Sequence, residues 1–451
     1  ATIGGMTGNN SCGARSIRYG TMRDNVRAID AIMTDGSEFR FGELPNDLGD
    51  NSLPPGYRDL AQTLLTLGER EAEEIFKRFP RLMRRVGGYN IDALVPGGSN
   101  HPGGGCPNLA HLLVVSEGTL AFSTRVHLGL HRVPKHKVLG ICHFPTFYSA
   151  MESTQHIVKL SPAAVELVDR NMMDLARDIP MFRPTIEKFV QGEPDSLLLV
   201  EFAGDELERQ LAKLNELGAL MSDLGYPNAV VEATTGADQS EFWNVRKSGL
   251  NIMMSMKAEA KPVSFVEDCA VELSDLAEYT DQLTRIFEKY GTTGTWYAHA
   301  SVGCLHVRPV LNMKRGEDVA AMRGIAEEAF DLVKRYGGSH SGEHGDGIAR
   351  SEFNAFMFGP KMAGLFADVK QMFDPQNIMN PGKITNAPKM DDRHLFRFAP
   401  GYKVNSFPTK LNWLAWPGAA GGLQGAVEMC NNNGSCRKLT GGVMCPSFRV
   451  T

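Results

Sequence analysis

The sequence predicts an α+β protein in which helices cover one face of a largely antiparallel sheet. From about residue 136 onward, strand-like apolar runs alternate with amphipathic helical segments, and this order is typical of the α+β class. The chain of 451 residues is 42% hydrophobic and 22% charged. These values belong to globular proteins and leave ample core for about two to four domains.

The first third of the chain predicts short strands and one long helix. Residues 26–33 are typical of a strand that enters a tight turn at Thr34, Asp35 and Gly36. Residues 57–79 carry an imperfect apolar stripe at helical spacing. Residues 109–130 combine an apolar stretch, a turn at 116–119 and an alternating strand pattern. Residues 96–107 form a glycine- and proline-rich loop.

The later part predicts a buried strand at 197–202 and three longer helices at 205–224, 274–290 and 317–336. Ser274 is a candidate cap for the second of these helices, and Gly291 and Gly337 follow the second and third as stop residues. Residues 307–311 predict an extended strand, and residues 384–425 predict a loop-rich linker.

Composition excludes several classes of protein. A net charge of −5 gives no nucleic-acid or anionic-membrane footprint, and no apolar run reaches the length of a membrane span. The eight cysteines are scattered except for three near the C-terminus, which favours a reducing compartment. We expect a cytoplasmic protein, with peripheral attachment at the inner membrane as the alternative location. A homo-oligomer is compatible with the sequence. Because the chain starts at Ala1 inside a loop motif, we expect an internal piece of a longer polypeptide.

Two histidine-containing runs predict a metal site. Residues 299–306 read HASVGCLH, and residues 342–347 read GEHGDG. Imidazole and carboxylate donors such as His299, His306 and Glu343 hold zinc-like divalent metals. His299 must reach His306 across the turn at 301–303, and His344 directly follows Glu343, which suggests an acid/base group beside a ligand.

The glycine-rich start of the chain predicts a ligand-binding loop. Glycines at positions 4, 5 and 8 let backbone amides approach a phosphate or a carbonyl-rich ring closely. A plain glycine-rich turn is the equal alternative. The run is not the G-x-G-x-x-G fingerprint, so a nicotinamide-binding fold is not indicated.

Four motifs in order carry a family resemblance. They are ATIGG at 1–5 with Asn10, GARS at 13–16 and YG at 19–20; SEGTL at 116–120; the histidine runs; and FDP at 373–375 with NPGK at 380–383. Over residues 1–388 the chain resembles the FAD-linked oxidases of the vanillyl-alcohol oxidase superfamily, in their D-2-hydroxyacid dehydrogenase branch. The resemblance implies an FAD site formed by Ile3, Gly4, Gly5, Gly8, Asn10, Ser11, Gly13, Glu117, Gly118, Thr119 and Asn380.

The resemblance also implies a division of the chain. Residues 1–135 would form the second half of a vanillyl-alcohol-oxidase-type FAD-binding domain. Residues 136–388 would form an α+β FAD-linked oxidase substrate domain. Residues 389–451 would hold a linker and the start of a ferredoxin-like iron–sulfur domain.

The same resemblance implies roles in the site and shows one departure. Arg246, in a W-x-x-R motif that starts at Trp243, would hold a substrate carboxylate, with a salt bridge as the alternative. The branch reads HxGDGNLH, whereas Ser301, Val302 and Cys304 stand here, so polar groups beside the metal are lost. Cys304 is either a soft ligand or a small buried residue. Lys261 is a weaker carboxylate candidate, and Glu267 and Asp268 are expected to be structural.

Three cysteines near the end, Cys430, Cys436 and Cys445 before Pro446, resemble part of an iron–sulfur pattern. Three thiolates cannot complete a 4Fe-4S cluster, so further ligands would lie past the end of the sequence. A zinc ribbon and chance clustering are the alternatives. With the flavin motifs, this layout resembles fused FAD/iron–sulfur dehydrogenases of bacteria.

The resemblance implies FAD-dependent oxidation of a D-2-hydroxy acid, first D-2-hydroxyglutarate and otherwise D-lactate or glycolate, to the 2-oxo acid. Zinc or manganese would assist, His344 would be the base, and iron–sulfur clusters would pass electrons to a quinone or an electron-transfer protein. Two rival interpretations come from other classes of protein, and only the first uses the same histidine and glutamate cluster. One is a zinc hydrolase, and the other is a non-catalytic electron-transfer segment.

Overall fold

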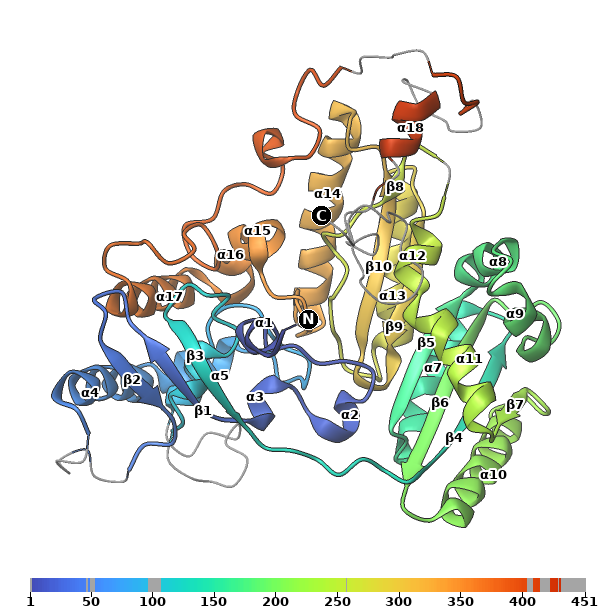
Figure 1. Cartoon of the computed structure of the whole chain (residues 1–451), viewed down its shortest axis with the longest axis horizontal. Coiled ribbons are helices and arrows are strands. Elements are labelled where there is room, and N and C mark those ends of the chain that lie inside the picture. Colours follow the sequence, from blue (N-terminus) through green and yellow to red (C-terminus); the bar gives the residue numbers. More distant parts are fainter. Residues whose placement is uncertain are drawn as a thin grey trace.

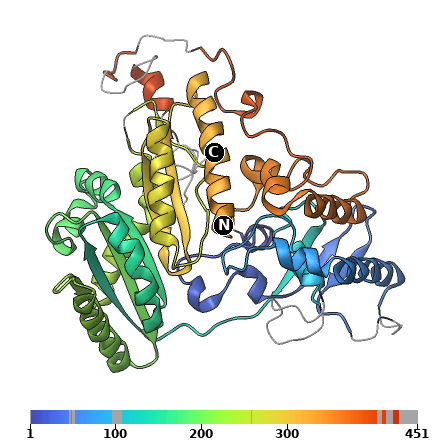
Figure 2. The same cartoon turned by 180° about the vertical axis from the view of Figure 1, so that it is seen from behind.

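The structure is a computed structural model that describes residues 2–45, 48, 53–95, 107–256, 258–403, 409–413, 422–428 and 430. Two bodies lie side by side, and the N-terminal helix lies between them in both views (Figures 1 and 2). One body is built on a three-stranded sheet and the other on a seven-stranded sheet. Among the described helices, none has the length and apolar character that a membrane crossing requires.

The first body contains the cofactor-type motifs. Its sheet has the order β2-β1-β3, and both pairings are antiparallel. Short helices precede and flank this sheet. Its elements are α1 (Ile3–Gly8), α2 (Ser16–Tyr19), α3 (Met22–Asn25), β1 (Val26–Ile32), β2 (Glu38–Phe41), α4 (Pro55–Arg70), α5 (Ala72–Arg78), η1 (Ile91–Leu94), α6 (Ala110–Leu113) and β3 (Phe122–Leu128).

Two local predictions in this body are wrong. The glycine-rich start is the helix α1 rather than an open loop, because the Thr2 hydroxyl accepts a hydrogen bond from the Gly5 amide at 3.1 Å and caps it. The helix predicted at 57–79 is two helices that meet at Glu71. The Glu71 carboxylate pairs with Arg70 and with Lys361 of a distant helix, a tertiary contact that no local pattern reveals.

The second body is a seven-stranded sheet of order β7-β4-β6-β5-β9-β10-β8, in which every pairing is antiparallel. This confirms the predicted α+β class with a largely antiparallel sheet. The strands are β4 (His136–Phe144), β5 (Ala164–Asp169), β6 (Ser196–Gly204), β7 (Val230–Ala233), β8 (Lys261–Pro262), β9 (Gly294–His299) and β10 (Cys304–Leu311).

Helices cover both faces of this sheet, not one face as predicted. Alternate residues of β6, such as Leu198 and Leu199, enter two separate apolar clusters, so the strand is buried on both sides. One cluster holds α7 (Phe147–Ile157), α10 (Leu207–Asp223), α13 (Leu276–Lys289) and α14 (Gly316–Arg335). The other holds α8 (Arg170–Asp178), α9 (Arg183–Phe189), α11 (Gly236–Lys247) and α12 (Gly249–Met253).

The three longer predicted helices are confirmed as α10, α13 and α14. Gly291 and Gly337, with φ of 68° and 63°, follow the last two as expected. Ser274 is not the cap of α13, because the helix begins after Asp275 and has no side-chain cap.

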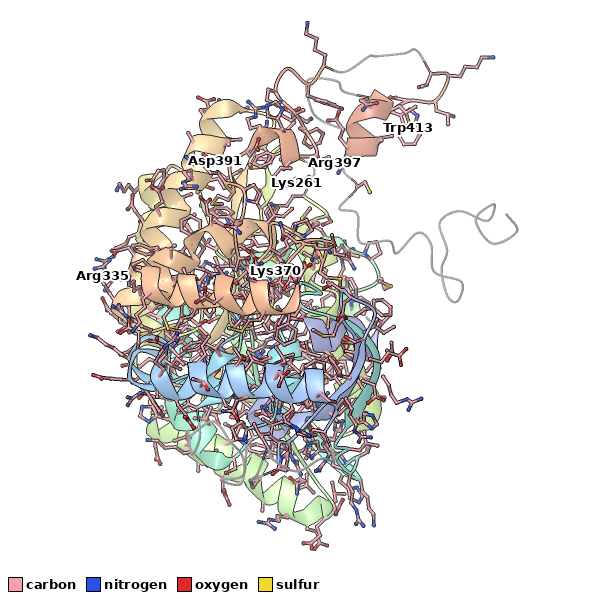
Figure 3. The ribbon with its side chains drawn as sticks, turned by 90° about the vertical axis from the view of Figure 1, so that its left-hand side faces the viewer. Lys261, Arg335, Lys370, Asp391, Arg397 and Trp413 are labelled. Atoms are coloured by element: carbon pink, nitrogen blue, oxygen red, sulfur yellow. The ribbon has the colours of Figure 1, made fainter. Side chains whose placement is uncertain are left out.

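The chain then returns to the first body through α15 (Gly347–Arg350), η4 (Ser351–Phe353), α16 (Asn354–Phe358) and α17 (Pro360–Phe373). Lys370, labelled on α17 in Figure 3, donates hydrogen bonds to the carbonyl oxygens of Thr119 and Met379, both at 2.7 Å. The Phe373 ring stacks on that of Phe41 at 5.9 Å. The closing motif and the 116–120 turn therefore meet.

Beyond residue 384 the described chain is mostly irregular, as the linker prediction expects, with η5 (Arg393–Leu395) and α18 (Gly422–Glu428). Of the predicted iron–sulfur cysteines, Cys430 is exposed, and Cys436 and Cys445 lie outside the described residues. The predicted iron–sulfur segment and domain boundaries stay predictions.

Candidate functional site

A tight hairpin brings the two predicted metal histidines together. His299 ends β9, and η3 (Ala300–Val302) and Gly303 lead into β10. In the antiparallel register His299 pairs with Cys304, and His306 pairs with Tyr297, so both imidazoles lie on one face of the sheet. Gly303 has a φ of 64°, and a Cβ there would collide with the Val271 carbonyl oxygen.

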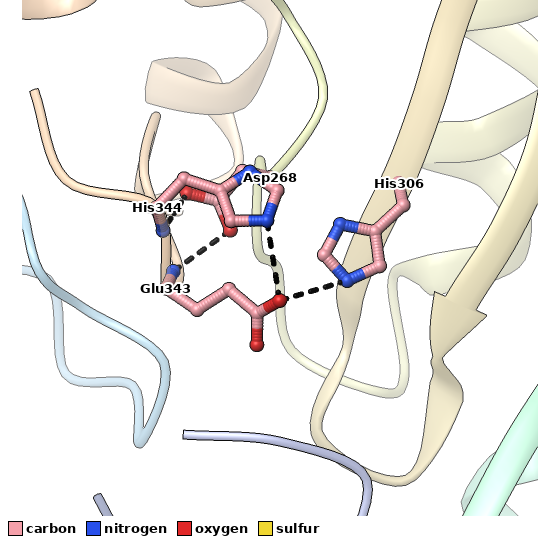
Figure 4. Close-up of side chains that lie close together, drawn as sticks. All are labelled: Asp268, His306, Glu343 and His344. Atoms are coloured by element: carbon pink, nitrogen blue, oxygen red, sulfur yellow. Dashed lines mark hydrogen bonds and ion pairs between the residues drawn. The ribbon is translucent and has the colours of Figure 1, made fainter. Parts of the chain in front are cut away.

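Glu343 is the centre of the site (Figure 4). Its Oε1 lies 3.0 Å from His306 Nε2 and 3.3 Å from His344 Nε2. Its Oε2 lies 3.2 Å from His299 Nε2 and 2.7 Å from Arg84 Nη1. The predicted ligands and the predicted base therefore converge on a single carboxylate.

Asp268 holds the backbone that carries this carboxylate. Its Oδ1 accepts the Glu343 amide and its Oδ2 accepts the His344 amide, both at 2.7 Å, and the Ser341 hydroxyl donates to Oδ2 at 2.7 Å. Ligand atoms of Asp268, His306, Glu343 and His344 all lie within 4.8 Å of one another. His299 of the predicted ligand set is not a member of this group, although its Nε2 lies 3.2 Å from Glu343 Oε2.

The donor set fits a divalent cation. Burial lowers the pKa of His306 well below its ordinary value, which favours the neutral form that a ligand needs. Burial would also lower the pKa of His299, but the carboxylates of Glu166 and Glu343 raise it. Burial alone would raise the pKa of Glu343, but the adjacent His306 and His299 hold it well below its usual range. A neutral imidazole and an ionised carboxylate are the forms that bind zinc or manganese.

His344 carries a proton in this arrangement. Burial would lower its pKa, but the carboxylates of Asp268 and Glu267 raise it to about 10. Its Nδ1 lies 3.3 Å from Glu267 Oε1, a contact that orients the ring. With 32% of its side chain exposed, His344 is the most accessible of the three imidazoles.

Sequence reasoning missed Glu166 and Arg84. Glu166 Oε1 lies 2.7 Å from His299 Nδ1 and its Oε2 lies 2.5 Å from Arg246 Nη2, so it orients the His299 ring from behind. A carboxylate inside the apolar strand β5 was the signal for this residue. Arg84 is fully buried and also donates to the Gly13 carbonyl oxygen at 2.9 Å. No local pattern marks Arg84.

The remaining polar candidates are placed as follows. The Arg246 guanidinium lies over the Tyr297 ring, 4.7 Å from its centre, and its buried Nε has no hydrogen-bond partner among the described residues. Lys261 donates to the backbone carbonyls of Met254 and Met256. Cys304 is buried, its pKa is raised by burial, and a Cβ on Gly342 would come within 2.7 Å of its sulfur. Its fit there favours a small buried residue over a thiolate ligand.

The cofactor-type segments are bonded directly to the 342–347 loop. Asn9 Nδ2 donates to the Glu343 carbonyl oxygen at 2.6 Å. The Glu117 carboxylate accepts the amides of Asp346 at 2.7 Å and Gly347 at 3.0 Å. Asn380 Nδ2 donates to the Glu117 carbonyl oxygen at 2.7 Å. The three regions of the FAD resemblance and the histidine site therefore form one connected unit.

Four glycines of this unit border open space. Built Cβ atoms on Gly4, Gly8, Gly13 and Gly118 would meet no atom within 4 Å, which leaves room for close approach to the backbone. Ile3 is 50% exposed beside them, whereas Asn10 and Thr119 are buried. Gly5 is capped by Thr2, and the Ser11 hydroxyl accepts from Asn9 at 3.3 Å.

Glu117 predicts a pH dependence of stability. Burial and the neighbouring Asp346 raise its pKa to about 7, whereas an unfolded glutamate titrates near 4.3. Between these values the folded state binds the extra proton, so its contribution to stability is complete at low pH and is lost as the pH rises to 7. Glu117→Gln removes this titration and keeps an amide-accepting oxygen.

We expect the unfolding free energy of the parent protein, relative to Glu117→Gln, to fall by roughly 1–3 kcal/mol between pH 4.5 and 7.5. Denaturant-unfolding titrations at several pH values in that range measure this difference in free energy. The exposed Glu206→Gln is the matched control. Parallel curves for parent and Glu117→Gln would contradict the raised pKa.

Comparisons with known proteins agree with this geometry. Residues 133–384 match the FAD linked oxidases, C-terminal domain, and residues 1–42 match an FAD binding domain. Among solved structures, p-cresol methylhydroxylase has a TM-score of 0.56 at 13% identity, covering 84% of this chain and 68% of its own. The 4-ethylphenol oxidase from Gulosibacter chungangensis has a TM-score of 0.54 at 14% identity, covering 86% and 70%. These two show the fold.

Several curated relatives are named as dehydrogenases. D-2-hydroxyglutarate dehydrogenase of Pantoea ananatis is 29% identical over 100% of this chain and 44% of its own length. That of Pseudomonas putida is 30% identical with the same coverage. D-lactate dehydrogenase of Archaeoglobus fulgidus is 27% identical over 85% of this chain and 70% of its own. The chain thus spans less than half the length of the D-2-hydroxyglutarate dehydrogenases that it matches.

These matches confirm the predicted flavin family and give the zinc-hydrolase alternative no support. The match to the substrate domain alone covers more than half of the 451 residues. The chain therefore belongs to the FAD-linked oxidases.

Proposed function

We propose that this chain holds the site at which a D-2-hydroxy acid, first D-2-hydroxyglutarate, is oxidised to the 2-oxo acid. The proposal rests on the contacts of the 342–347 loop, which joins the histidine hairpin to the cofactor-type segments. Glu343 faces His299 and His306 of the hairpin, and the same loop is held by Asn9 and Glu117 of the cofactor-type segments. The proposed binding sites for the substrate, the metal and the flavin would therefore adjoin one another.

The chain's own residues would hold both cofactors. His299, His306 and Glu343 would bind a zinc or manganese ion, which as a Lewis acid lowers the pKa of a bound hydroxyl. The glycines of the first segment and of the 117–118 turn would contact FAD, which accepts the hydride equivalent when it is bound. Glu166 fixes the His299 ring so that Nε2 faces the Glu343 carboxylate.

His344 would move the hydroxyl proton. Its Nε2 points at Glu343 Oε1, and Glu267 holds its other nitrogen, so the ring orientation is fixed for proton transfer. The surrounding carboxylates raise the pKa of His344 to about 10, which favours its protonated form. His344 would therefore accept a proton only when positive charge near Glu343 offsets the effect of these carboxylates. Arg246 would bind a substrate carboxylate through its unpartnered Nε.

We expect His344→Gln to slow flavin reduction by D-2-hydroxyglutarate by about 10²–10⁴-fold, since a positioned general base contributes that much. FAD content is expected to be unchanged, because His344 is not among the proposed flavin contacts. Anaerobic stopped-flow bleaching of the flavin band measures the rate, and the exposed His394→Gln is the matched control.

The outcomes separate the alternatives. Unchanged bleaching in His344→Gln would remove the base role. A flavin band that D-lactate or glycolate bleaches faster than D-2-hydroxyglutarate would replace the first substrate by one of these acids, in line with the names of other relatives. Electron transfer through a 4Fe-4S cluster to a quinone or a protein acceptor belongs to the same proposal. Cys430, Cys436 and Cys445 would supply part of the cluster's ligands, and visible and electron-spin-resonance spectra of the protein test for the cluster.

A further inference from the structure

Arg308 is a buried cation that the proposed mechanism does not use. It lies on β10 two residues after His306, so both side chains project from the same face of the sheet. Only 5% of the residue is exposed. Its Nε donates to the Ser264 hydroxyl and its Nη1 donates to the Tyr297 hydroxyl, both at 2.7 Å. Both partners are neutral.

The other buried arginines of this region each have a carboxylate. Arg246 pairs with Glu166 at 2.5 Å, Arg84 with Glu343 at 2.7 Å and Arg350 with Glu267 at 3.5 Å.

Within the described part of the chain, no carboxylate oxygen lies within the 4.0 Å ion-pair distance of the Arg308 guanidinium. Burial alone would raise the pKa of Glu267, but His344 and Arg350, with a smaller contribution from Arg308, lower it. Its Oε1 faces His344 and Arg350, and its buried Oε2 has no hydrogen-bond partner among the described residues. A buried charge with no carboxylate in contact lowers the stability of the protein. An anionic ligand that binds from solution would therefore stabilise the Arg308 guanidinium.

Arg246 and Arg308 meet at one aromatic ring. Their guanidinium carbons lie 4.7 Å and 5.4 Å from the centre of the Tyr297 ring, and that ring lies 4.8 Å from the His306 ring. The two guanidinium groups and the proposed metal histidine therefore all lie against one aromatic ring. Ser264, which holds Arg308, is exposed, so this end of the site opens toward solvent.

We infer that Arg308 binds the second carboxylate of the substrate, and that it makes the site selective for D-2-hydroxy dicarboxylates over D-lactate and glycolate. This inference rests on the proposed function. Arg246 would hold one carboxylate through its unpartnered Nε, and Arg308 would hold the other through guanidinium N–H groups that Ser264 and Tyr297 do not accept. A monocarboxylic acid would leave the Arg308 charge uncompensated, and this costs it affinity.

The test compares substrates within one variant. Arg308→Met is expected to lower kcat/KM for D-2-hydroxyglutarate on the order of 10²-fold, mainly through KM, because it removes a charge-assisted contact of the bound acid. The kcat/KM for D-lactate is expected to change less than about threefold. Arg308→Lys keeps the charge without the fork, so an intermediate loss of roughly tenfold is expected. The exposed Arg285→Met is the control.

Ser264→Ala keeps the test falsifiable if Arg308→Met does not fold. It removes only the anchor of Nε at an exposed position, and a rise of about threefold to tenfold in KM for the dicarboxylate alone is expected. Equal losses for D-lactate and D-2-hydroxyglutarate in either variant would overturn the inference.

Calorimetric binding of glutarate, which has no hydroxyl to oxidise, separates this inference from the proposed function. Glutarate binding that is lost in Arg308→Met, without flavin reduction by any hydroxy acid, would support the inference and overturn the function. Glutarate binding that is unchanged in Arg308→Met would overturn the inference while flavin reduction by the parent protein stands.

Discussion

Replacing Glu343 by glutamine is expected to abolish both metal binding and substrate-dependent flavin reduction, with a loss in rate of at least about 10³-fold. The two Glu343 oxygens serve His299, His306, His344 and Arg84 at 2.7–3.3 Å. Glutamine preserves the shape of the side chain but removes the negative charge that a divalent cation needs. Its NH₂ group would also face hydrogen-bond donors such as the Arg84 guanidinium. Metal content per protein and anaerobic flavin bleaching measure the two effects.

Flavin content is the internal reference for this variant. Glu343 is not among the proposed FAD contacts, so bound FAD is expected to stay near the parent level. Removal of metal from the parent by a chelator is expected to reproduce the loss, and added zinc or manganese is expected to restore activity in the parent but not in Glu343→Gln. The exposed Glu327→Gln on α14 is the matched control. Full metal content in Glu343→Gln would contradict the ligand role.

The sequence predicts the parts of this site that lie close together along the chain. The HASVGCLH run contains both histidines and the turn between them, and in the structure these become the end of β9, η3 and β10. Helices α10, α13 and α14 follow from apolar periodicity, and glycines mark the ends of two of them. In these cases local spacing and the tertiary structure demand the same residues.

Partners that are distant in sequence could not be predicted. Arg84 reaches Glu343 across 259 residues, and Glu166 reaches His299 across 133. The first pairing depends on how the two bodies pack, and the second depends on the strand order that places β5 beside β9. A single arginine or glutamate carries no local signature of either arrangement. Glu166 gave only a weak signal, an acidic residue within an otherwise apolar strand. The sequence predicted a structural role for Asp268. It did not predict that Asp268 accepts the backbone amides of Glu343 and His344.

One local cap and one tertiary contact changed two of the local predictions. Glycines at the start of the chain suggested an open loop, yet one threonine hydroxyl and the intrahelical bonds suffice for a six-residue helix. Periodicity at 57–79 suggested a single helix, and the pairing of Glu71 with Lys361 of α17 coincides with its break. In both places the missing information was the identity of a hydrogen-bond partner rather than a propensity.

Asp268→Ala is expected to destabilise the protein by about 3–5 kcal/mol, the largest stability effect among these variants. The substitution leaves the buried amides of Glu343 and His344 and the Ser341 hydroxyl without their acceptor. Asp268 also adopts a φ of 87°, a left-handed conformation that alanine tolerates poorly. Denaturant or thermal unfolding of the FAD-loaded protein measures the loss.

Asp268→Asn distinguishes the loss of hydrogen bonding from the loss of charge. Asparagine keeps one acceptor oxygen and tolerates positive φ, so a loss of roughly 1–2 kcal/mol is expected. Because the 342–347 loop depends on those hydrogen bonds for its position, metal content is expected to fall in Asp268→Ala in parallel with stability, and to be largely kept in Asp268→Asn. If Asp268→Ala kept its stability and lost only metal, Asp268 would be a ligand instead of the support of the loop. Its two carboxylate oxygens, each already accepting a backbone amide at 2.7 Å, argue for the support.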